Sequence, residues 1–213
     1  MITLAIDTST TRGGVALLAG GILRLEENFV ADRSHSASLF SVLERARALI
    51  PGQHLDQVAV GLGPGSYAGV RIAIAAAIGL EFGLGAQLVG IPSAAALETD
   101  EPHFLAIGDA RRETFYFTRV ENGVCREGPL LATESELRAR LAGFPELPVF
   151  TSVAIPEFPD ARIALPCAAK IARIAAEGIG TLMTGDLEPI YLREAHITQP
   201  KARGWSRANK HPQ

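Results

Sequence analysis

The stretch ITLAIDTSTTRGGVALLAGGILRLEENF, residues 2–29, contains three short segments with the composition of β-strands. In the first segment, apolar residues alternate with smaller ones as far as Asp7. A polar turn separates it from residues 15–19, and Gly20-Gly21 then supplies the positive φ angles of a tight turn before residues 22–29. Three consecutive short strands joined by tight turns predict an antiparallel meander.

After this meander the apolar residues change to a helical period. A helix is predicted over residues 39–50, where apolar residues recur every three or four positions. Two more are predicted over 67–84, which ends at Gly85, and over 93–98, which Pro92-Ser93 opens. Short buried strands at 58–60 and 87–91 separate these helices. Antiparallel strands followed by alternating helices and strands predict an α/β fold, in which helices cover a mixed sheet.

The second half of the chain begins with the same order of elements. A strand over 104–108 ends at Asp109, as the first strand ends at Asp7. A further strand over 114–120 runs into the hairpin signal Asn122-Gly123. A capping box, a helix, a strand and a last helix are predicted at residues 133–136, 137–141, 147–152 and 166–179.

This repetition predicts two halves of related topology, residues 1–100 and 101–198, with the second half abbreviated. Residues 199–213 form a basic tail that we expect to be flexible, with four Lys or Arg residues and no acid. The whole chain has a net charge of −3, so the rest of it carries −7. This balance disfavours a uniformly basic nucleic-acid binder. A tail containing Trp205 could bind RNA through phosphates and stacking, or it could only improve solubility.

The composition indicates a globular protein, since 47% of the residues are hydrophobic and 20% are charged. The two cysteines fit a reducing compartment. Cys125 and Cys167 are far apart and form no C-x-x-C pair, which argues against a disulfide framework or a zinc knuckle. The most apolar stretch, residues 72–80, is well below the ~20 residues of a membrane span. With no recognisable secretory leader, we expect a cytoplasmic protein that does not contact a membrane.

An acid and two hydroxyls follow the first predicted strand as Asp7, Thr8 and Ser9. A turn of this kind can hold a magnesium ion and bind phosphate oxygens. The alternative interpretation is that these side chains only satisfy the amides of their own turn.

Two further segments are candidates for binding an anion. A glycine-rich loop containing Gly63, Gly65 and Ser66 precedes the helix at 67–84, and free N–H groups at a helix start favour negative charge. The alternative role of this loop is a tight turn that allows close packing of helix and sheet. Asp109 and Arg111 form the second candidate, because a guanidinium can bind phosphate bidentately. An ion pair or a solvated turn is the alternative there.

The helix predicted over residues 67–84 is apolar on nearly every side and rich in Ala and Gly. A helix of this composition must be covered on every side. Either the helix at 39–50 covers its outer face or another protein chain does, and both interpretations remain open.

No catalytic constellation can be assembled from the motifs of this chain. The five histidines are scattered without an H-x-x-x-H or H-E-x-x-H pair, and there is no G-x-S-x-G nucleophile elbow. We therefore predict no catalytic residue and no metal ligand.

Six motifs together closely resemble the TsaB (YeaZ-like) family of tRNA threonylcarbamoyladenosine (t6A) biosynthesis proteins, a glycoprotease-like group of the actin-like ATPase superfamily. They are Ile6–Thr10, His35-Ser36, Gly63–Arg71, Gly90–Ala94, Asp109–Glu113 and Glu188–Arg193. The resemblance implies an actin-like (ASKHA) fold of two ribonuclease-H-like halves, each with an antiparallel meander, parallel strands and helices.

The same resemblance implies a non-catalytic scaffold subunit that binds and stabilises a TsaD-type transferase, its paralogue. A TsaE-type ATPase would join the complex, and tRNA would be contacted only indirectly. This subunit alone would bind no cofactor, while ATP or ADP and magnesium could bind in the complex. The isolated chain would self-associate as a homodimer.

In the family, the two helices of the first half form the interface with the partner. The positions implied here are His35, Leu39, Leu43, Gly69, Arg71, Ala73, Ala76 and Leu80. The alternative function is a stand-alone actin-like ATPase or phosphotransferase that uses Asp7 and the Gly61–Ser66 loop.

Overall fold

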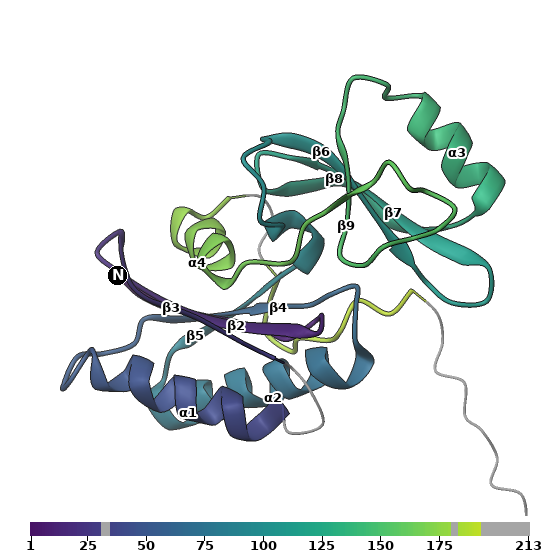
Figure 1. Cartoon of the computed structure of the whole chain (residues 1–213). Helices are drawn as coiled ribbons and strands as arrows, with labels where there is room; N and C mark the ends of the chain where they lie inside the picture. Colours follow the sequence, from purple (N-terminus) through teal and green to yellow (C-terminus); the bar gives the residue numbers. More distant parts are fainter. Residues whose placement is uncertain (31–34, 180–182, 193–213) are drawn as a thin grey trace, which may run out of the picture.

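Two β-sheets with helices packed on their faces make up the computed structural model, which describes residues 1–30, 35–179 and 183–192 (Figure 1). The tail at 199–213 lies outside the described residues.

The first sheet has six strands in the order β11-β5-β4-β1-β2-β3. β1 pairs antiparallel with β2 and parallel with β4, and β2 pairs antiparallel with β3. The predicted meander is therefore confirmed, and Gly20 and Gly21 have positive φ angles of 58° and 78° in its second turn. The strands are β1 Ile2–Asp7, β2 Arg12–Ala19, β3 Ile22–Val30, β4 Gln57–Gly61, β5 Gln87–Ile91 and β11 Met183–Thr184.

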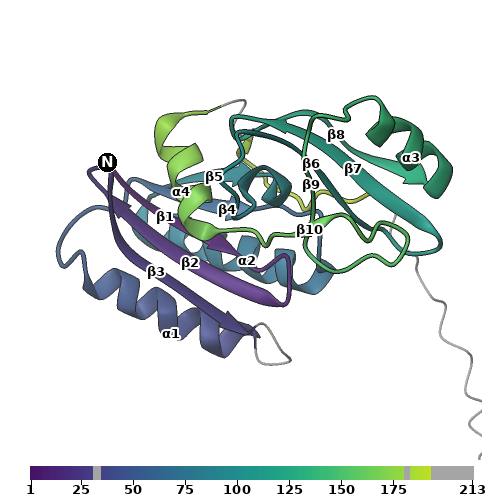
Figure 2. The ribbon, with the colours of Figure 1, turned by 45° about the horizontal axis from the view of Figure 1, so that its top comes forward.

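Helices cover both faces of this first sheet. α1 (His35–Ala48) and α2 (Tyr67–Leu84) lie side by side on one face, and α4 (Ala168–Glu177) lies on the other (Figures 1 and 2). Beneath α1 and α2 the core contains large side chains such as Leu17, Leu39 and Leu62. Under α4 it is built mainly from alanines, which allow the helix to approach the strands closely.

The second sheet repeats the topology of the first with five strands in the order β10-β9-β6-β7-β8. β6, β7 and β8 form an antiparallel meander, and β9 pairs parallel with β6 as β4 pairs with β1. The structure thus has the predicted actin-like fold of two ribonuclease-H-like halves, with no helix between β9 and β10. The elements are β6 His103–Asp109, β7 Thr114–Glu121, β8 Val124–Thr133, α3 Glu134–Ala142, β9 Val149–Thr151 and β10 Arg162–Ile163.

The division of the chain at residues 100 and 101 does not describe the packed units. α4 comes after the second sheet in the sequence, but it packs on β1, β2 and β4 of the first sheet. β11 then pairs antiparallel with β5, at the far edge of that sheet. The end of the described chain therefore belongs to the first half, because its small apolar residues cover the open face of the first sheet.

The helix predicted at 93–98 is also wrong, since only a 3-10 turn at Ser93–Ala96 forms there. Leu97 takes an extended conformation and forms an isolated bridge with Pro166, and the Glu98 N–H donates to the Leu165 carbonyl at 2.8 Å. Pairing with this distant segment ends the helix early.

Of the described residues, one helix, α2, is long and apolar enough by length and composition to cross a membrane. A core helix of a soluble protein passes the same test, and the inner side of α2 packs on β4, β1 and β5.

Candidate functional site

Asp7 ends β1 and is 1% exposed, at the centre of a group of polar residues. Its Oδ1 accepts hydrogen bonds from the Ser9 N–H at 2.8 Å and the Ser9 hydroxyl at 2.7 Å. Its Oδ2 accepts a hydrogen bond from the Ser93 hydroxyl at 2.6 Å, and the Ser93 Oγ in turn accepts from the Gly63 N–H at 2.9 Å. The carboxylate therefore joins the β1–β2 turn to the two loops that follow β4 and β5.

Burial raises the pKa of Asp7 above its ordinary value of 3.8, because the charged form has lost its solvation. The hydrogen bonds from Ser93 and Ser9 and the positive charge of Arg12 lower the pKa again, but they do not offset the burial. The folded protein thus retains a carboxyl group whose charged form is costly to bury.

The glycine-rich loop packs directly against the turn that follows Asp7. The Thr8 hydroxyl donates to the Gly69 carbonyl at 2.7 Å, and the Ser66 N–H donates to the Ser9 carbonyl at 2.6 Å. A Cβ atom at Gly65 or Gly69 would overlap the carbonyl oxygens of Ser9 and Thr8, respectively. These glycines are therefore required for the close approach of the two segments, which is the packing role that we considered for the loop.

Ser66 begins α2 as its N-cap, with its Oγ accepting from the Gly69 N–H at 3.2 Å. Together with Asp7, Thr8 and Ser9 it forms a set of groups that bind one another. In the described structure, both carboxylate oxygens of Asp7 and the hydroxyls of Thr8 and Ser9 are engaged within the chain. The interpretation that these side chains satisfy their own surroundings is the one that the geometry supports, and a nucleotide or magnesium contact stays a prediction.

Asp109 occupies the corresponding position at the end of β6, but it is exposed. Its Oδ1 accepts from the Arg111 N–H at 2.6 Å, so it caps its own hairpin turn. Arg111, Arg112 and Glu113 have φ angles of 67°, 54° and 58°, three successive residues in the left-handed region. Among the described residues, no hydrogen bond joins the Asp109 and Asp7 side chains. In the same part of the chain, no group of three or more His, Cys, Asp or Glu side chains could hold a metal ion.

Most of the predicted partner-binding side chains are not at the surface. The side chains of Leu39, Leu43 and Ala73 are buried in the core of the first half. Gly69 faces the Thr8 backbone, and Ala76 is 8% exposed. These five residues are buried in the described chain, and their assignment as direct contacts of a partner stays a prediction.

The other predicted partner-binding positions lie nearer the surface. Arg71 is exposed and Leu80 is half-buried. His35 begins α1, and its side chain lies outside the described part of the chain.

The outward side of α2 carries an apolar stripe that we define as Tyr67, Ala75, Ile78, Gly79 and Phe82, all of them exposed. Phe82 is 89% exposed, Tyr67 is 52% and Ile78 is 38%. The sequence analysis named mostly inner positions of α2 and none of the members of this stripe. Counting in steps of three and four along the helix from Arg71 would have found Tyr67, Ala75, Ile78 and Phe82.

At the start of α2, Tyr67 contacts both Arg71 and an aromatic ring from a distant part of the chain. The Arg71 guanidinium donates to the Tyr67 hydroxyl at 3.1 Å and lies 5.2 Å from the centre of that ring. The Tyr191 ring packs 5.5 Å from the Tyr67 ring, centre to centre. The glycine-loop motif and the Glu188–Arg193 motif therefore meet at this point, as far as the described residues extend.

The fold and this site define an actin-like α/β protein whose first-hairpin polar residues bind one another and whose second helix exposes an apolar stripe. The model of a family described as TsaD, tRNA N6-adenosine threonylcarbamoyltransferase, matches residues 29–147. The chain belongs to this family, within its TsaB/YeaZ-like members, as the relatives below specify.

A relative with a functional name agrees with this placement, and uncharacterised proteins also match the chain. The tRNA threonylcarbamoyladenosine biosynthesis protein TsaB of Haemophilus influenzae is 32% identical over 125 residues, 55% of this chain and 52% of that protein. An uncharacterised protein of Mycobacterium leprae is 32% identical over 156 residues, 68% of this chain but 44% of its own length. This chain thus spans about half of these two relatives. An uncharacterised protein of Mycobacterium bovis is 30% identical and is covered over 90% of its length.

Solved structures show the same fold. YeaZ from Pseudomonas aeruginosa is 25% identical with a TM-score of 0.64, and the match covers 90% of this chain and 99% of that one. A second Pseudomonas aeruginosa structure, an uncharacterised protein with similarity to peptidase YeaZ, gives a TM-score of 0.68 at the same identity and coverage.

Proposed function

We propose that this chain is a non-catalytic scaffold subunit required for t6A modification of tRNA, and that it binds and stabilises a TsaD-type transferase through the apolar stripe of α2. The observation that carries this proposal is the exposure of Ile78 and Phe82 on a helix whose other side is packed in the core. Membership of the family and the printed name of the Haemophilus influenzae relative supply the pathway.

The energetics of the stripe favour a protein partner. Covering a large apolar side chain such as Phe82 contributes about 1.5–3 kcal/mol. Small residues at Ala75 and Gly79 on the same face allow a partner helix to approach closely. Phe40 on the neighbouring α1 is also exposed, at 53%. An exposed apolar area with aromatic residues is typical of an interaction surface.

The polar group around Asp7 is consistent with a subunit that does no chemistry. In this group the Thr8 hydroxyl holds the β1–β2 turn against α2, and Asp7 holds the same turn to the loop that follows β5. In this proposal the isolated chain pairs with a second copy through the same stripe. A TsaE-type ATPase, nucleotide with magnesium, and tRNA are engaged only in the cytoplasmic complex.

The test is co-purification of a TsaD-type partner with the Phe82→Glu and Ile78→Glu variants. A charge on this face leaves the core intact and must be desolvated in the complex, so we expect each change to weaken binding by about 30-fold or more. Val153→Glu is the matched control, because Val153 is 59% exposed on the other half. The t6A content of tRNA in cells that depend on each variant should fall in parallel.

Unweakened binding by Phe82→Glu would show that the stripe is not the interface. Magnesium-dependent ATP hydrolysis by the isolated chain, abolished in a folded Asp7→Asn variant, would instead support the alternative function as an ATPase or phosphotransferase.

A further inference from the structure

A hollow of about 680 Å³ lies in the second half, remote in sequence from the stripe of α2. Its walls are the end of α3, the segment leading into β9 and the connection from β9 to β10. We name it the α3–β9 hollow. Its volume falls within the ~300–1,000 Å³ of typical ligand sites. Neither the polar group around Asp7 nor the apolar stripe contributes to it.

The base of the α3–β9 hollow is apolar and firmly held. Phe158 is buried there and packs edge-to-face on Phe115, with ring centres 5.2 Å apart. The guanidinium of Arg138 lies 4.8 Å from the centre of the Phe158 ring and donates to the Glu157 carbonyl at 2.7 Å. Leucine and proline side chains complete the base. This surface suits a flat aromatic side chain, which prefers rings and prolines as neighbours.

The rim of the hollow is acidic. Four carboxylates and two guanidiniums line it, so two negative charges remain. Arg138 pairs with Glu134 outside the hollow, and Arg162 pairs with Glu101 across it at 3.7 Å. Among the described residues, the carboxylates of Glu146, Glu157 and Asp160 make no ion pair or hydrogen bond. An occupant with an aromatic group and flanking positive charges would match both the base and the rim.

The sequence contains one segment of this chemistry. Residues 199–213 carry Lys201, Arg203, Arg207 and Lys210, with no acid, around the single Trp of the chain, Trp205. Twelve residues separate the last described residue, Leu192, from Trp205, and the thirteen steps between the two reach about 43 Å when the chain is extended. This reach exceeds twice the ~17 Å radius of gyration expected for a 213-residue domain.

We propose that the α3–β9 hollow binds the basic segment 199–213 of its own chain, with Trp205 against Phe158 and the flanking arginines at Glu146, Glu157 and Asp160. Tethering places the segment at an effective concentration of about millimolar order, so a site too weak for a free peptide is still occupied. The inference is independent of the proposed function, because it involves neither α2 nor Asp7.

Because Trp205 is the only tryptophan, the intrinsic fluorescence of the full chain reports its surroundings directly. At low salt we expect emission at short wavelength and protection from acrylamide, independent of protein concentration. The rim variant Glu146→Gln/Glu157→Gln/Asp160→Asn should shift the emission to that of a solvated tryptophan and abolish the protection. Sodium chloride at 1 M should do the same, since it reduces the screening length to about 3 Å.

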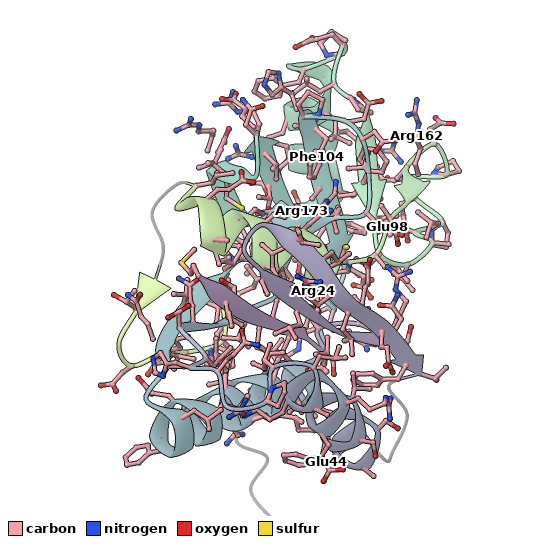
Figure 3. The ribbon with its side chains drawn as sticks, turned by 90° about the vertical axis from the view of Figure 1, so that its left-hand side faces the viewer. Arg24, Glu44, Glu98, Phe104, Arg162 and Arg173 are labelled. Atoms are coloured by element: carbon pink, nitrogen blue, oxygen red, sulfur yellow. The ribbon has the colours of Figure 1, made fainter. Side chains whose placement is uncertain are left out.

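The matched control, Glu44→Gln/Glu81→Gln/Glu177→Gln, removes the same charge from the helices of the first half. Figure 3 shows Glu44 on α1, far from Arg162 at the rim of the hollow. This control should keep the protected emission. Solvated emission in the unmodified chain would overturn the proposal. So would protection that survives the rim variant, or protection that disappears on dilution and thus comes from a second copy.

Discussion

At the scale of single residues, Asp7 shows how a carboxylate can be structural at a position suited to chemistry. The position after β1 and the hydroxyls around it are those of a phosphate-binding turn, but the groups that bind Asp7 come from its own chain. Gly61 contributes by having no side chain, since a Cβ there would overlap Oδ2 of Asp7. The residue therefore ties together segments that are 86 positions apart in sequence.

This burial predicts a pH dependence for the Asp7→Asn variant. Because the folded pKa is raised above 3.8, the folded state binds the proton more tightly than the unfolded state. The contribution of Asp7 to the free energy of unfolding is thus largest below pH 3.8 and falls as pH rises through the raised pKa. Asn cannot titrate. The difference in the free energy of unfolding between the natural chain and the Asp7→Asn variant should therefore fall as pH rises through the raised pKa.

Urea unfolding from about pH 4 to pH 7 measures this difference. Glu27 and Glu136, whose pKa values are lowered by hydrogen bonds from Arg45 and Thr133, are present in both proteins and cancel. A difference that is flat or rises with pH would contradict a raised pKa at Asp7.

The sequence predicted the candidate residue here, but not its role. Asp7, Thr8 and Ser9 could be identified because they follow a strand, which is a local pattern. Ser93, which binds Asp7, could not be foreseen as its partner, because the contact depends on β1 and β5 lying in one sheet on either side of β4. Local patterns show which groups are present, and the topology decides which groups meet.

At the scale of elements, α2 has the predicted bounds, residues 67–84. Its N-cap at Ser66 and the left-handed Gly85 at its end are signals that a sequence displays directly. The orientation of the helix is less accessible, because an apolar pattern on every side does not show which side faces the sheet. The burial of Ala73 and Ala77 and the exposure of Phe82 answer that question.

Two glycines of α2 should respond in opposite ways to the same change. Gly69→Ala would drive a Cβ into the Thr8 carbonyl, so we expect a loss of about 1–3 kcal/mol in the free energy of unfolding. Gly79→Ala places its Cβ in open space on the exposed side, and the better helix propensity of Ala should add about 0.5–1 kcal/mol. Thermal and urea unfolding of the two variants test this pair. Equal effects would show that α2 does not pack on the Asp7 turn as described.

At the scale of the whole molecule, the two halves are connected by more than one passage of the chain. α4 follows the second sheet in sequence and yet covers the face of the first sheet formed by Ala5, Ala16 and Ala59. The repetition of strand orders was predictable, since each half displays its own meander. The return of α4 and β11 to the first sheet was not predictable. The sequence of a short amphipathic helix is equally compatible with packing on either sheet.

Ile171 in α4 provides the test of this connection. It is fully buried against the first sheet, so Ile171→Ala should lower the free energy of unfolding by about 2–5 kcal/mol. Arg173, two residues later and exposed on α4 (Figure 3), is the control, and Arg173→Ala should change stability by less than about 0.5 kcal/mol. Hydrogen exchange shows where the loss acts: amides of β1, β2 and β4 in the first sheet should lose protection in Ile171→Ala. If the loss were confined to the second sheet, then α4 would stabilise the half that precedes it in sequence, and the connection between the halves described here would be wrong.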